Sequence, residues 1–143
     1  MKFRFRFASL LKVRKHKEHI ERQKLGMLLE QKNALVREIE EEQESILSSF
    51  AFTADRLATT SSIRMGYEFM HDRKKAIIKL QQELEEVNAQ LEKQQKALTE
   101  ANRKVKMIEM IEAKDFEEFT KKQNAIEQLQ LNEVAMQIFN RTN

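Results

Sequence analysis

The sequence predicts an all-α fold, a long antiparallel two-helix coiled-coil hairpin with a C-terminal helical overhang. The first reason is composition: the 143 residues include no Pro, two Gly and 34% charged residues. Because turns draw heavily on Gly and Pro, such a chain has room for only one or two reversals. A bias toward Gln, Glu, Lys, Leu and Ala is typical of long helices and coiled coils. A globular α/β enzyme is therefore not expected.

The second reason is a heptad repeat in the second half of the chain. Companion apolar positions lie three or four residues from each member of the repeat, and Gln94 interrupts them. This spacing predicts a coiled-coil seam. A weaker seam in the first half includes Leu11, Leu35 and Ile39. Steps of seven residues define the main repeat, which consists of Met70, Ile77, Leu84, Leu91, Leu98 and Val105.

The third observation is the stretch ATTSSIRMG between the two seams, where small hydroxyl residues cluster and charges are few. Ser and Thr are favoured as helix N-caps, so we expect Ser61 or Ser62 to cap a second helix. The prediction is a single coiled-coil domain over residues 1–143, with helix one over about 3–58, the reversal at about 59–62 and helix two over about 63–140.

A short connection makes neighbouring helices antiparallel. With the reversal placed there, Leu35 comes opposite Val87, and Phe3 comes level with Phe119. The opening MKFRFRF alternates like a strand, but we interpret it as the start of helix one. In a helix, Phe3 and Phe7 lie on the seam face. Phe5 then points away, between Arg4 and Arg6, and is the one ring that packing does not explain.

Residues after about 120 have no partner within this hairpin. The overhang is nevertheless rich in apolar residues, because NAIEQLQLNEVAMQIF contains seven of them in sixteen positions. An unpaired helix of this kind is more typical of partner binding than of fraying, and we favour a different partner over self-association.

The charge is concentrated at one end of the chain. Residues 1–24 carry nine Lys/Arg against two Glu, and the remaining residues carry seventeen Lys/Arg against twenty-one Asp/Glu. A basic start with aromatic residues also suits nucleic acid or an anionic membrane surface. No nucleic-acid module accompanies it, however, and we favour a protein-docking tip.

Enzyme chemistry is not predicted. The chain has no Cys, no phosphate-cradling Gly-rich loop and no nucleophile constellation. His16 and His19 lie three residues apart, but two histidines without further ligands are better interpreted as a solvated basic face than as a zinc site. We expect no catalytic residue, metal, cofactor or small-molecule substrate. Without a long apolar run, we also expect a soluble cytoplasmic protein.

Three stretches resemble the bacterial flagellar FliJ family. FRFRFASLLKVRKHKE resembles the family's opening, in which aromatic and basic residues alternate before a Leu pair. ANRKVKMIEMIEAKDFEEF is similar to its segment late in the second helix. EQLQLNEVAMQIFNR is similar to its terminal motif, with Asn132–Glu133 where an acidic pair is expected.

The resemblance implies a soluble stalk of the flagellar type III protein export apparatus, which serves motility. Such a stalk inserts into the export ATPase hexamer, promotes its assembly and links it to the membrane export gate protein and export chaperones. It implies a monomer in isolation, peripherally associated with the cytoplasmic face of the inner membrane at the flagellar base, without nucleic acid. The expected partner-binding residues are Arg4, Phe5, Arg6, Arg14, Ile126, Leu129, Glu133, Met136 and Phe139.

Two alternatives remain open at this point. The equivalent stalk of an injectisome has the same expected architecture. A coiled-coil binding chaperone of the prefoldin type also presents apolar helix ends, although such chaperones carry β-hairpins where TTSSIRMG offers no strand pair.

Overall fold

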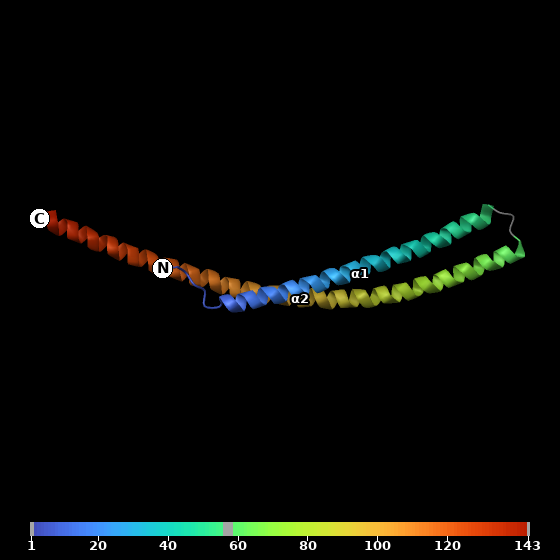
Figure 1. The fold of residues 1–143 in the computed structure, drawn as a ribbon, viewed down its shortest axis with the longest axis horizontal. Coiled ribbons are helices and arrows are strands. Elements are labelled where there is room, and N and C mark those ends of the chain that lie inside the picture. Colours follow the sequence, from blue (N-terminus) through green and yellow to red (C-terminus); the bar gives the residue numbers. More distant parts are fainter. Residues whose placement is uncertain (1, 56–58, 143) are drawn as a thin grey trace. The chain divides into compact units, whose positions relative to one another are not determined.

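The computed structural model describes residues 2–55 and 59–142 and is built from two long helices. Helix α1 covers Ala8–Asp55 and helix α2 covers Thr60–Thr142. The two helices pack side by side, and no strand occurs in the described residues (Figure 1). The predicted helical hairpin is therefore confirmed as a fold class.

The start of α1 differs from the prediction. Helix α1 begins at Ala8, not near residue 3, and residues 2–5 have no regular secondary structure. The physical reason is the period-two alternation of the opening. An extended segment turns Phe3 and Phe5 to the same side, whereas a helix would separate them by about 200°. Outside the helix, both rings pack against the rest of the terminal unit.

The cap of α2 also differs from the prediction. Thr59 is the capping residue, because its Oγ1 accepts a hydrogen bond from the backbone N–H of Ser62 at 3.3 Å. Its backbone carbonyl accepts the N–H of Ile63 at 3.0 Å. A hydroxyl at the position before the first helical turn satisfies an N–H that would otherwise lack a partner. Helix α2 therefore starts at Thr60, three residues before the expected start.

The helix contacts form two compact units, and we describe each by itself. The terminal unit comprises Met1–His19 and Thr99–Asn143, and the reversal unit comprises Ile20–Leu98. The expected end of helix one falls on residues 56–58, which lie outside the described residues. The single domain over residues 1–143 stays a prediction.

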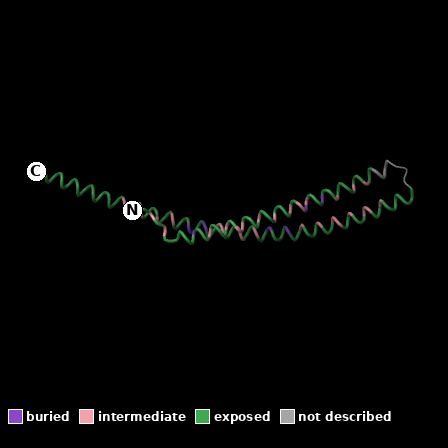
Figure 2. The backbone as a smooth tube through the Cα atoms, viewed as in Figure 1, coloured by how far each residue is buried: buried purple, intermediate pink, exposed green. Residues whose placement is uncertain are grey.

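The reversal unit has a thin apolar core between its helices. Leu35, Val87 and Leu91 are buried there, which places Leu35 and Val87 in one cluster as the register predicted. Figure 2 shows that burial is confined to short stretches along the chain. Four partly buried leucines pack around this cluster, namely Leu25, Leu28, Leu80 and Leu84.

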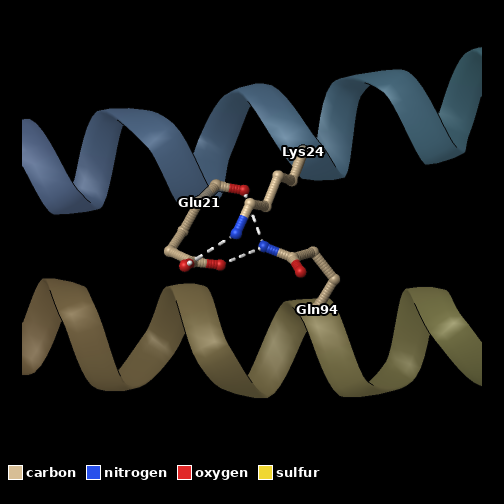
Figure 3. A network of polar contacts seen from close by, with 3 residues as sticks. All are labelled: Glu21, Lys24 and Gln94. Carbon is tan, nitrogen blue, oxygen red and sulfur yellow. Dashed lines mark hydrogen bonds and ion pairs between the residues drawn. The ribbon is translucent and has the colours of Figure 1, made fainter.

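Polar residues occupy seam positions in the same unit and pair across it. Gln94 interrupts the heptad of α2, and its side-chain amide donates to the backbone carbonyl of Glu21 at 3.0 Å. The amide also donates to the Glu21 carboxylate, which forms an ion pair with Lys24 at 3.6 Å (Figure 3). Nearer the reversal, Arg73 donates to both Glu42 carboxylate oxygens at 3.0 and 3.1 Å. These pairs explain why the seam of α1 appears weak in the sequence.

Candidate partner-binding site

The N-terminal segment, residues 2–7, lies against α2 in the terminal unit. The ring of Phe3 packs edge-on against Phe116, with centroids 5.3 Å apart, and lies 5.5 Å from the ring of Phe119. The prediction that Phe3 lies opposite Phe119 is therefore confirmed. Along the segment, exposed residues at positions 2, 4 and 6 alternate with partly buried ones at 3 and 5. The segment thus presents its cations outward while its aromatic rings hold it to α2.

The position of Phe5 corrects the helical interpretation. Phe5 is partly buried and packs against the core cluster of Leu11, Val105 and Ile108. The exposed ring is Phe7, which contacts the Phe5 ring edge-on at 5.8 Å. The expectation that Phe5 points away from the core is therefore wrong, because residue 5 lies before the helix, in a segment without regular secondary structure.

The three predicted cations of this region differ in their surroundings. Arg4 is exposed. Arg6 forms an ion pair with Asp115 at 3.4 Å, and its guanidinium lies 4.7 Å from the centre of the Phe7 ring. Arg14 is half-buried on α1. Asp115 lies one heptad after Ile108, at a seam position of α2, so the basic opening supplies the ion-pair partner of an acidic residue within the seam.

The end of α2 forms what we call the tail, residues 124–142. The tail is helical, and every one of its residues is exposed (Figure 2). The five C-terminal residues of the predicted site lie in it. The side chains of Ile126, Leu129, Met136 and Phe139 are about half or more exposed, and Glu133 is exposed as well. The helix therefore continues for several turns with its apolar side chains uncovered.

The apolar residues of the tail are distributed around the helix. At 100° per residue, Leu129 and Met136 share one side with Ile126, whereas Leu131, Val134 and Ile138 share another. Phe139 lies between the two groups. A surface helix normally has one apolar stripe, and a helix that is apolar on several sides is normally buried on several sides. The tail is therefore suited to a partner that surrounds it.

The nine predicted residues thus form two groups in the terminal unit. Arg4, Phe5, Arg6 and Arg14 belong to the first group, beside the paired part of α2, and the other five lie farther along α2 in the tail. The aromatic contacts of Phe3 end at Phe119, before the tail begins. The site therefore combines the cations of residues 1–19, which we call the basic collar, with the apolar tail.

A second apolar surface was missed by the sequence reasoning. It is a shallow hollow in the reversal unit, and its exposed aromatic residues, Phe50 and Tyr67, were the available signal. Their significance depends on the pairing of the helices, which the periodicity alone does not resolve near a reversal. The lining residues are Ser49, Phe50, Ile63, Gly66, Tyr67 and Met70.

Two other types of site are absent from the part of the chain that the structure describes. In residues 2–55 and 59–142, no group of three or more His, Cys, Asp or Glu side chains is arranged to hold a metal ion. In the same residues, neither helix contains a stretch apolar and long enough to cross a membrane.

The comparison with known families supports the resemblance of the sequence motifs. The family model described as "Flagellar FliJ protein" matches residues 2–143. No curated protein and no solved structure matched the chain. Members of this family are non-enzymatic components of the flagellar export apparatus. With its helical hairpin and a family match over essentially its whole length, the chain belongs to the flagellar FliJ protein family.

Proposed function

We propose that this chain is the stalk of the flagellar export ATPase, which inserts its terminal unit into the ring of that enzyme and promotes ring assembly. The observation that carries the proposal is the tail. It is a helix of several turns with apolar side chains on more than one side, all of them exposed. The lumen of a ring is a partner that can cover such a helix from several directions.

The basic collar has a different role in this proposal. Residues 1–19 carry seven Lys/Arg and one Glu, and most of these cations are exposed. Charges at the edge of an interface mainly accelerate and orient encounter, whereas buried apolar anchors determine how slowly the complex dissociates. Arg4 and Arg14 would orient the chain toward an acidic ring entrance. Phe5 would act indirectly, by holding the segment that presents Arg4 and Arg6.

The chain itself would perform no chemistry. ATP hydrolysis would take place in the ring, and the stalk would bias its assembly and couple it to the membrane export gate protein and to export chaperones. In this account the protein is a monomer in isolation. It is then peripherally associated with the cytoplasmic face of the inner membrane at the flagellar base, because its partners are there.

A binding assay with the purified cognate export ATPase tests the proposal. The full chain is compared with a chain ending at Lys121 and with the double variant Leu129→Gln, Met136→Gln. Loss of two exposed apolar anchors should weaken binding at least tenfold, on the order of 1.4 kcal/mol or more. Met27→Gln is the matched control, because Met27 is 71% exposed on α1 in the other unit. Equal binding of all four chains would contradict the proposal.

The binding-chaperone alternative receives support from the same exposed tail, since uncovered apolar side chains can hold unfolded clients. The two functions differ in assembly. A chaperone of the prefoldin type is an obligate oligomer, whereas the stalk is a monomer. Sedimentation equilibrium of the full chain separates them, because a mass near 17.0 kDa supports the stalk.

A further inference from the structure

The outer side of α2 in the terminal unit carries an apolar patch that precedes the tail and is separate from it. Met107, Met110 and Ile111 are spaced three and four residues apart, so they share one face of the helix. Met107 is 56% exposed and Met110 is 72% exposed, whereas the neighbouring Val105 and Ile108 are buried on the side facing α1. The outer face of a paired helix is normally polar. We call these three residues the methionine patch.

Lysines border the methionine patch. Lys104 precedes Met107 by three residues, Lys106 precedes Met110 by four, and Lys114 follows Met110 by four, so all three lie beside the patch. All three are exposed, and none of them forms an ion pair with another described residue. The patch therefore has a border of lysines that form no ion pair with the described residues.

Carboxylates limit the patch along the helix axis. Glu100 lies one heptad before Met107, and Glu118 lies one heptad after Ile111, so both lie on the same face as the patch. Glu100 forms an ion pair with Arg103 at 4.0 Å. The lysine-bordered stretch from residue 104 to residue 114 is about 15 Å long, or about three helical turns.

We propose that the methionine patch binds an amphipathic α-helix whose apolar stripe is bordered by Asp or Glu. Apolar contact with unbranched, adaptable methionine side chains would supply affinity. The lysines would select an acidic partner by charge complementarity. A partner helix of three to four turns matches the length of the patch and would pack on α2, on the side away from α1. This surface is separate from the tail, and the proposal does not depend on the stalk function.

An anionic membrane fits the patch less well than a helix does. A helix that lies on a membrane needs an apolar face over most of its length, with cations beside it. Here Glu100 and Glu118 would be pressed against the anionic headgroups at both ends of the patch. Three apolar residues between two carboxylates match a short protein contact instead.

Methionine-methyl NMR on the full chain tests this proposal, because the seven methionines act as reporters in several places. The chain is labelled with ¹³C at the methionine methyl groups and titrated with a synthetic 18-residue amphipathic helix that has a Leu stripe and Glu borders. We expect shifts at Met107 and Met110, and none at Met27, Met65 or Met136. Matched titrants are a peptide with Lys borders and vesicles of anionic phospholipid.

A charge-reversal variant sharpens the test. Lys104→Glu combined with Lys114→Glu should weaken binding of the Glu-bordered peptide about tenfold or more and allow the Lys-bordered peptide to bind. Helicity by circular dichroism should not change, because both lysines are exposed. Met27→Gln should leave peptide affinity unchanged, whereas Met110→Gln should weaken it.

Several outcomes would overturn the proposal. Shifts at Met136 alone would place peptide binding at the tail. Equal shifts with both peptides would indicate apolar contact without selection for acidic borders, and shifts with vesicles alone would indicate a lipid surface. Shifts that appear when only the protein concentration rises would indicate a second copy of this chain. No shift with the Glu-bordered peptide would also reject it.

Discussion

The side-chain amide of Gln94 in α2 bonds to both the backbone carbonyl and the carboxylate of Glu21 in α1, 73 residues earlier in the chain (Figure 3). This double contact occurs at a seam position, one helical turn from the buried Leu91. An apolar seam can slide by a heptad with little loss, whereas a polar pair is satisfied in one alignment only. Gln94 therefore specifies how the two helices of the reversal unit align.

Two replacements of Gln94 should affect the free energy of unfolding and the alignment of the helices differently. Gln94→Ala should lower the free energy of unfolding by about 1–2 kcal/mol, since two cross-helix hydrogen bonds are lost. Gln94→Leu should recover that loss through apolar packing but permit more than one register. Because the chain has no Cys, spin labels at Arg37→Cys and Glu85→Cys report the alignment directly. We expect one narrow distance distribution in the parent and a broader one in Gln94→Leu. Equal widths would contradict this role.

Phe5 and Phe7 should respond differently to truncation. Phe5→Ala should lower the free energy of unfolding by about 1–3 kcal/mol, because the ring packs on the Leu11 cluster. Phe7→Ala should cost less than about 1 kcal/mol, because its ring is exposed at the surface. Urea titration followed by circular dichroism measures both. The reverse order of effects would restore the helical interpretation of the opening.

Gly26 should be replaceable with a gain in stability. It lies inside α1, and a Cβ added there meets nothing within 4 Å. Gly in a helix interior costs about 0.5–1 kcal/mol relative to Ala. Gly26→Ala should therefore raise the free energy of unfolding by that amount and raise the midpoint of thermal unfolding. A lower midpoint would mean that the helix at this position is not as open as described.

Arg73 should not be replaceable by Lys without loss. Its guanidinium donates to both Glu42 oxygens and lies 5.0 Å from the centre of the Phe69 ring. An ammonium cannot reproduce the planar stacking. Since the pair is partly exposed, Arg73→Lys should cost about 0.5–1 kcal/mol. A double-mutant cycle with Glu42→Gln tests this, and a coupling energy near zero would show that the pair contributes nothing.

The heptad repeat was sufficient to predict the helical hairpin and its pairing. Apolar residues at seam spacing determine which faces meet, so Leu35 with Val87 and Phe3 with Phe119 could be placed from the sequence. The cap could not be placed as well, because four consecutive hydroxyl-bearing residues, Thr59–Ser62, compete for that position. Local propensities do not separate them.

The opening segment shows why part of the site escaped prediction. FRFRF has a period of two, yet its neighbours are strongly helical, and a single sequence does not indicate where one pattern yields to the other. The outcome depends on Phe116, Phe119 and the Leu11 cluster, which accept Phe3 and Phe5 on one side. The seam role of Glu21 was missed for a related reason, since its partner Gln94 is identified only once the helices are aligned.

The most direct test of the proposed stalk function measures the purified cognate export ATPase with and without this chain. The readouts are the rate of ATP hydrolysis and the oligomeric state by mass photometry. We predict that the full chain increases both the rate and the fraction of hexamer, and that the Leu129→Gln, Met136→Gln double variant does not. An ATPase whose rate and oligomeric state are the same with and without the full chain would contradict the account.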